Sequence, residues 1–201
     1  PANDEPYVNQ IMLAFTGGAG GPNADCWQTI CHVGNGGLCY YDSVELDELR
    51  HPLYVHARNF SADTEGAGRF CGARSARSEF GPIRGQMDVA YVSDGAINNA
   101  KGVRGGRDGT PAGQHKVSRN GDRVDLPNVG VVTLETGERI VSQTTGGGGY
   151  GAPTERNAEM VRRDVSEGYI SAARAQEVYG VVFDTTGNVD PAATADLRAQ
   201  R

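Results

Sequence analysis

The segment Thr144-Thr145-Gly146-Gly147-Gly148-Gly149-Tyr150-Gly151-Ala152-Pro153 divides the sequence into two regions of different periodicity. Before it, short β-branched and aromatic runs are bounded by Gly, Pro, Asn or Asp, which predicts strands joined by turns. After it, apolar residues recur at helical spacing. This order predicts an α+β fold, with a mostly antiparallel sheet that is sandwich-like or barrel-like and a helical C-terminal segment. We expect a glycine-rich, mainly β region over residues 1–152 and a helical segment over 153–201.

Local signals place the individual elements. Asn120-Gly121 predicts a hairpin with a type I′ turn, and Asp42 is expected to cap a short helix that ends before Pro52. Asn157, Ser171 and Asp190-Pro191 are expected to start three helices, the first two closed by Gly168 and Gly180. The predicted strands cover residues 11–15, 29–33, 53–60, 87–93, 129–134, 139–145 and a short run at 181–183.

The glycine content is the unusual feature of the composition. Glycine occupies 29 of 201 positions, which is about twice the usual share. The glycines cluster at 17–21, 34–37, 102–109 and 146–151, where we expect close approach by a ligand or a neighbouring subunit. A chain of 201 residues can bury a core without disulfide or metal staples, which excludes the knottin-like and zinc-finger classes.

Charge and hydropathy limit the kinds of partner and the cellular location that we expect. The net charge is −6, but residues 51–123 carry eleven bases against seven acids, or +4. These bases alternate with acids, which favours a solvated surface over an acidic or nucleic-acid partner. No apolar run could span a bilayer, and the first six residues lack the features of a signal peptide, so we expect a cytoplasmic protein with reduced cysteines.

Two places could carry chemistry. His32 and Asn35 lie in the run His32-Val33-Gly34-Asn35-Gly36-Gly37, where a glycine loop could aim an imidazole and a carboxamide at water or a carbonyl. The alternative, a zinc site made by Cys26, Cys31, His32 and Cys39, lacks paired C-x-x-C spacing, so we expect no metal on this chain.

The glycine run before the helical region is the second place. Gly146, Gly147, Gly148, Gly149 and Tyr150 precede a helix and could bind an anion through their N–H groups, or else form a packing or interface loop. Gly146, Gly148 and Gly151 fit G-x-G-x-x-G formally, but a second helix follows where a dinucleotide fold needs a parallel strand.

The C-terminal motifs resemble a known family. Residues 144–156, then Val161-Arg162-Arg163-Asp164-Val165, Glu167-Gly168-Tyr169-Ile170-Ser171 and Tyr179-Gly180-Val181-Val182 are similar to the carboxyl end of the hydantoinase B/5-oxoprolinase family. The segment His32 to Asn35 resembles a further motif of that family. The resemblance covers about residues 15–184 and only the C-terminal portion of the longer family members.

The resemblance implies a place in an ATP-dependent, hetero-oligomeric complex. A kinase-like hydantoinase A-type subunit would phosphorylate a small-molecule substrate, and the B component would hydrolyse the activated cyclic amide. A ketone carboxylase of the acetone or acetophenone type is the alternative, and a non-catalytic assembly module is a third. ATP and a divalent metal are expected on partner chains, one of which carries the N-terminal portion of the B component. This chain alone is expected to be inactive, with no nucleic-acid or membrane partner.

Overall fold

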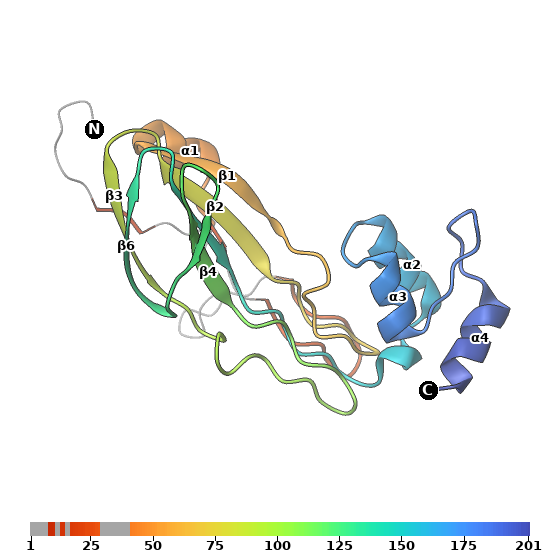
Figure 1. The fold of residues 1–201 in the computed structure, drawn as a ribbon. Helices are drawn as coiled ribbons and strands as arrows, with labels where there is room; N and C mark the ends of the chain where they lie inside the picture. Colours follow the sequence, from red (N-terminus) through yellow and green to blue (C-terminus); the bar gives the residue numbers. More distant parts are fainter. Residues whose placement is uncertain (1–7, 11–12, 15–16, 29–40) are drawn as a thin grey trace.

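The computed structural model describes residues 8–10, 13–14, 17–28 and 41–201. The molecule is elongated, with β-structure at one end, helices at the other and extended glycine-rich segments between them (Figure 1). The predicted α+β class is therefore confirmed. The described strands are antiparallel and form no closed barrel.

The main sheet has five strands in the order β1-β2-β7-β4-β5. Strands β3 and β6 pair separately and form a two-stranded ribbon. The ribbon covers one face of the sheet, where Phe80 and Ile140 pack with Val132, Leu134 and Leu13. The strands are β1 (Leu53–Phe60), β2 (Ala76–Pro82), β3 (Gln86–Val92), β4 (Gly113–Val117), β5 (Arg123–Asp125), β6 (Val129–Glu135) and β7 (Arg139–Gln143).

The predictions for β1, β3, β6 and β7 are confirmed to within two residues at each end. Strand β2, whose sequence includes Arg77, Ser78 and Glu79, was not predicted. The hairpin predicted at Asn120-Gly121 is present as β4 and β5, but its turn type was predicted wrongly. Five residues, 118–122, connect these strands, and positive φ occurs at Gly121 but not at Asn120, so the turn is not type I′. The predicted runs 11–15 and 29–33 lie partly or wholly outside the described residues.

Helix α1 (Val44–Arg50) begins one residue later than predicted. Its N-cap is Ser43 and not Asp42, because the Ser43 hydroxyl accepts the N–H of Leu46 at 3.3 Å. The helix ends at Arg50, and the backbone of the C-cap residue His51 is extended, as expected before Pro52.

The helical segment follows the predicted caps. After the short 3-10 helix η2 (Pro153–Glu155) come α2 (Ala158–Ser166), α3 (Ala172–Tyr179) and α4 (Pro191–Ala199), with Asn157, Ser171 and Asp190 as N-caps. The predicted strand at 181–183 is wrong, since only an isolated bridge joins Phe183 to Val189. None of the described helices is long and apolar enough to cross a membrane.

The helices pack on the glycine-rich middle of the molecule. Val161, Val178 and Tyr179 form a buried cluster with Ala67 and Cys71, which belong to the extended segments. Helix α4 is attached to the other helices, because its Arg198 donates hydrogen bonds to the backbone carbonyls of Tyr179 in α3 and of Arg156 before α2. The proposed division at residue 152 remains a prediction, and this cluster joins the parts on either side of it.

Candidate functional site

Four extended segments form a bundle of closely packed backbone, called here the glycine bundle: residues 17–21, 64–73, 101–110 and 145–151. The last segment contacts the other three. Its hydrogen bonds to them include Gly20 N–H to Gly148 O at 2.9 Å, Gly66 N–H to Gly147 O at 2.8 Å and Val103 N–H to Gly149 O at 3.0 Å.

The bundle explains why these positions are glycine. A Cβ added at Gly147 would lie 2.0 Å from the carbonyl oxygen of Gly18, and one at Gly148 would lie 2.1 Å from that of Lys101. Real side chains do not approach backbone so closely. The close approach predicted from the glycine clusters is therefore made, in these segments, by the chain's own backbone.

The anion contact predicted for Gly146–Tyr150 stays a prediction. Four of these five N–H groups already donate within the chain, at 2.8–2.9 Å. An anion bound by those four groups would displace the bonds that hold the bundle together. The bonds run from Gly146 to Thr110, Gly147 to Ala73, Gly149 to Arg107 and Tyr150 to Phe70.

His32 and Asn35 lie outside the described residues, as do Cys31 and Cys39 of the zinc alternative. Their predicted role therefore stays a prediction. Within the described part of the chain, no group of three or more His, Cys, Asp or Glu side chains is placed to hold a metal ion.

A buried ionic cluster joins the glycine bundle to the helices. The Arg156 guanidinium is 1% exposed and forms a bidentate pair with Asp25 at 2.6 and 2.9 Å. Its Nη2 also donates to Asp164 at 2.8 Å, and Asp164 contacts Arg74 at 3.3 Å. Burial pushes the pKa of Asp25 up, but the hydrogen bond and charge of Arg156 outweigh burial and leave that pKa lowered. This cluster fixes α2 on the bundle. No local sequence signal predicts it, because Asp25 and Arg156 are far apart in the chain.

A second buried cluster surrounds Glu65, which is 1% exposed. Its Oε1 accepts from Tyr179 Oη at 2.8 Å and from Arg174 Nε at 2.7 Å, and the Tyr179 hydroxyl lies 3.1 Å from Cys71 Sγ. Burial raises the pKa of the Cys71 thiol to about 11. The thiol is therefore protonated at neutral pH and is not a nucleophile. Both clusters therefore have a structural role: they hold α2 and α3 against the glycine bundle.

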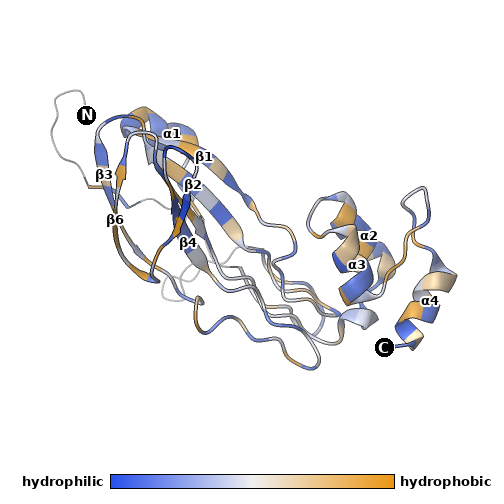
Figure 2. Cartoon of the chain, in the orientation of Figure 1, coloured by the Kyte–Doolittle hydropathy of each residue, from blue (hydrophilic) through white to orange (hydrophobic). Residues whose placement is uncertain are grey.

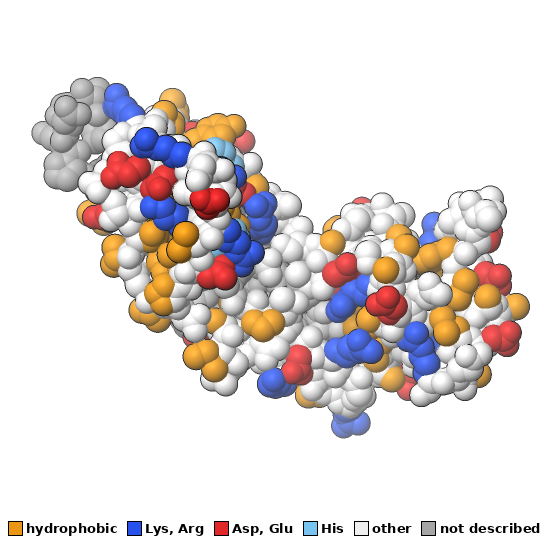
Figure 3. Space-filling view, in the orientation of Figure 1, with side chains coloured by type: hydrophobic (Ala, Val, Ile, Leu, Met, Phe, Trp, Pro, Cys, Tyr) orange, Lys and Arg blue, Asp and Glu red, His pale blue; other side chains and the backbone are white. Residues whose placement is uncertain are grey.

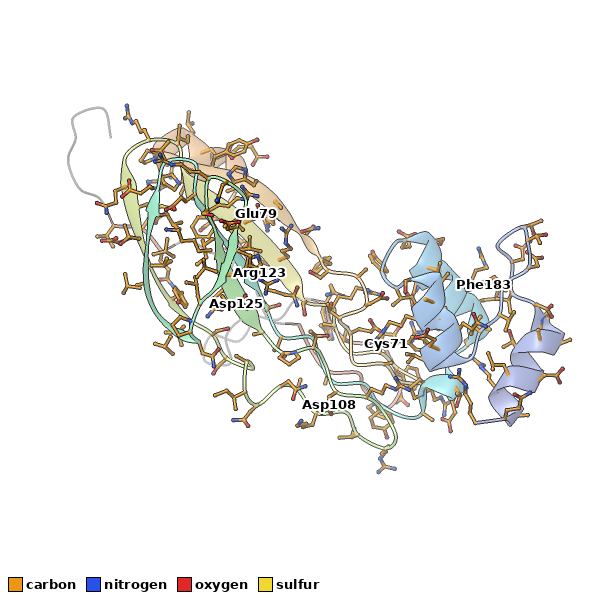
Figure 4. All side chains as sticks on the ribbon, in the orientation of Figure 1. Cys71, Glu79, Asp108, Arg123, Asp125 and Phe183 are labelled. Atoms are coloured by element: carbon orange, nitrogen blue, oxygen red, sulfur yellow. The ribbon has the colours of Figure 1, made fainter. Side chains whose placement is uncertain are left out.

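The open site is on the sheet face opposite the ribbon. A hollow of about 410 Å³ crosses β2, β7, β4 and β5. Figure 4 labels Glu79, Arg123 and Asp125 on this part of the molecule. The polar and charged residues lining the hollow are Arg77, Gln114, His115, Arg123, Asp125 and Gln143.

The charges at this hollow are mostly paired. The Glu79 carboxylate lies between the guanidinium groups of Arg77 and Arg139, and Arg123 donates to Asp125 at 2.7 Å. Burial, and then the charge of Arg123, lower the pKa of His115, so its imidazole is neutral at pH 7. The hollow can hold polar groups, but its paired charges give it no activated nucleophile.

The amino-acid sequence matches known proteins along most of its length. The model of the hydantoinase B/oxoprolinase family matches residues 2–153. The caprolactamase subunit beta of Pseudomonas jessenii is 31% identical over 203 residues, which cover 98% of this chain and 35% of that protein. The acetone carboxylase alpha subunit of Xanthobacter autotrophicus is 27% identical, over 78% of this chain and 25% of that protein.

Solved structures agree with these matches. The ATP-dependent caprolactamase from Pseudomonas jessenii has a TM-score of 0.86 and 28% identity, over 99% of this chain and 35% of that one. Nucleotide-free acetone carboxylase, at 21% identity and a TM-score of 0.70 over 92% of this chain and 29% of that one, shares the fold. The chain thus spans about a third of the length of the caprolactamase subunit. Since the family model covers most of the sequence, the chain belongs to the hydantoinase B/oxoprolinase family.

Proposed function

We propose that this chain forms part of the B component of an ATP-dependent, multi-subunit hydrolase that opens a cyclic amide. The observation that carries the proposal is the similarity to the caprolactamase subunit, which extends over 98% of the chain at 31% identity. The similarity includes the fold, with a TM-score of 0.86.

The chemistry explains the need for ATP. An unstrained amide is a poor electrophile, because its nitrogen lone pair delocalises into the carbonyl. Phosphorylation of the carbonyl oxygen gives an O-phosphorylated imidate, whose carbon is attacked by water. The C–N bond of the resulting tetrahedral intermediate then breaks and the ring nitrogen leaves as the amine. A second water hydrolyses the acyl phosphate that remains to a carboxylate and inorganic phosphate. We assign the phosphorylation to a kinase-like A-type subunit and the hydrolysis to the B component, in the cytoplasm.

We also propose a division of labour in which partner chains hold the metal and ATP. In support, the described residues include no group of three or more His, Cys, Asp or Glu side chains that could hold a metal ion. The remainder of the B component would be supplied by polypeptide outside residues 1–201. This chain would be inactive without it.

The assembled complex should release ADP when it is given a cyclic amide. We expect turnover with a lactam, 5-oxoproline or a hydantoin, and none with acetone plus bicarbonate, measured by coupled ADP release and by product analysis. The similarity to acetone carboxylase supports the opposite result as the alternative function. Carboxylation of the ketone, with no cyclic-amide turnover, would replace the hydrolase proposal by a carboxylase.

Within that complex, His32→Ala and Asn35→Ala should each lower kcat by about 10²-fold or more, the usual contribution of a proton-transfer or polarising group. His56→Ala is the matched control, because this histidine is exposed on β1 and should leave kcat unchanged. Steady-state ADP release measures all three variants. Wild-type turnover in the His32 and Asn35 variants would exclude both residues from the mechanism.

A further inference from the structure

The ribbon made by β3 and β6 has an inner face that packs on the sheet and an outer face that does not. Met87, Val89 and Leu134 belong to the inner side. Because side chains alternate along a strand, the residues between them point outward. The outward residues are Gln86, Asp88, Ala90 and Val92 of β3, and Val129, Val131, Thr133 and Glu135 of β6.

The outer face has two halves of different chemistry. In one half Gln86 pairs with Glu135, and Thr133 donates to Asp88 at 2.6 Å. This polar half is typical of a strand face in water. The other half consists of the cross-strand pairs Ala90–Val131 and Val92–Val129, called here the apolar half.

The apolar half is open to solvent. Val92 is 78% exposed, Val129 64% and Val131 68%. These residues line a shallow hollow of about 360 Å³ together with Ala90, Tyr91 and Gly130. Figure 2 shows hydrophobic colouring along the part of β6 near this hollow, and Figure 3 shows hydrophobic side chains gathered on the same side of the molecule.

The size of the apolar half indicates what kind of surface covers it. Its four side chains expose on the order of 300 Å², whereas a stable stand-alone interface needs roughly 800 Å² from each partner. A second copy of this chain seated on the apolar half alone would therefore bind weakly. That area requirement does not apply to a polypeptide that also contacts this chain elsewhere, because its other contacts supply the remaining area.

The similar caprolactamase chain contains further polypeptide outside the match. This chain superposes over 99% of its length on the caprolactamase chain, of which it covers 35%. The matching ribbon there belongs to a chain with about twice as much polypeptide outside the match. We propose that the apolar half is the docking surface for the part of the B component outside residues 1–201, which covers it with aliphatic or aromatic side chains. This inference rests on the proposed function.

Photo-crosslinking tests the proposal in the complex isolated through a tag on this chain. Benzoylphenylalanine replaces Val92 in one variant and Asp88, in the polar half of the same strand, in the control. We expect irradiation to join position 92, and not position 88, to B-type polypeptide outside residues 1–201, identified by mass spectrometry. A crosslink to a second copy of residues 1–201, or no crosslink, overturns the proposal.

A charge variant gives a second readout. Val131→Lys should weaken the association by about tenfold or more, because the ammonium group would be buried in an apolar contact. Thr133→Lys, two residues along the outer face, should change it less than about threefold. Unchanged association of Val131→Lys, with both variants folded by thermal melting, overturns the proposal. ADP release with a cyclic amide, measured on the same preparations, tests the proposed function separately. A crosslink without turnover would reject the proposed function and support the docking surface. Turnover without a crosslink would support the proposed function and reject the docking surface.

Discussion

Gly147→Ala is expected to unfold the chain. The added Cβ would lie 2.0 Å from the carbonyl oxygen of Gly18 and 2.7 Å from the backbone nitrogen of Ala73. Both atoms belong to backbone of other segments, so neither can swing away as a side chain would. Relief of the clash requires loss of the hydrogen bonds from Gly147 N–H to Ala73 O and from Gly66 N–H to Gly147 O, both 2.8 Å. We expect a loss of more than about 4 kcal/mol in the free energy of unfolding, a size reserved for severe core damage.

Gly113→Ala is the matched control. A Cβ at this position meets nothing within 4 Å, and the residue does not have positive φ. The change should alter the free energy of unfolding by less than about 0.5 kcal/mol. Urea denaturation followed by circular dichroism measures both variants. Equal stability of the two would mean that Gly147 is not enclosed by backbone as the structure has it.

The elements that were predicted correctly carry local signals. The alternation of β1 and the caps Asn157, Ser171 and Asp190 are properties of a few neighbouring residues. The capping side chain bonds to an N–H two or three positions away, so the sequence contains the whole interaction. The C-terminal helices could therefore be placed to within a residue or two.

Strand β2 was missed because its stabilisation is not local. Its charged residue Glu79 is unfavourable for a central strand by propensity. In the fold, Glu79 forms one ion pair with Arg77 on its own strand and another with Arg139 on β7. The second partner is adjacent only after β2 and β7 have paired.

The glycine clusters show a different limit. The sequence indicates that something approaches the backbone closely at 146–151, but it does not say what. The partners turn out to be three segments that begin as far away as residue 17. Distance along the chain also hid the buried ionic cluster, because Asp25 and Arg156 are 131 positions apart.

Arg156→Met is expected to have the second largest effect. The guanidinium is 1% exposed and pairs with Asp164, whose side chain is 5% exposed, and with Asp25, whose side chain is 29% exposed. Methionine keeps much of the packed volume but leaves the buried Asp164 carboxylate with Arg74 as its nearest cation, and it also removes the ion pair of the partly exposed Asp25. Removing one partner of a buried ion pair costs about 3–5 kcal/mol. We expect a loss of this size in the free energy of unfolding at pH 7, measured by urea denaturation.

The pH dependence separates lost charge from lost packing. In the wild type the pKa of Asp25 is lowered, so its contribution to stability is present above the ordinary carboxyl pKa and is lost as the pH falls through the lowered value. In Arg156→Met, the guanidinium that opposes the effect of burial is gone, so burial should raise the pKa of Asp25. Protonation of Asp25 then favours the folded state. The loss in free energy of unfolding relative to the wild type should therefore be smaller at pH 5 than at pH 7. Arg162→Met, which breaks the exposed pair with Glu159 on α2, should cost less than about 0.5 kcal/mol at either pH. An Arg156→Met deficit that is the same at both pH values would instead assign the loss to packing.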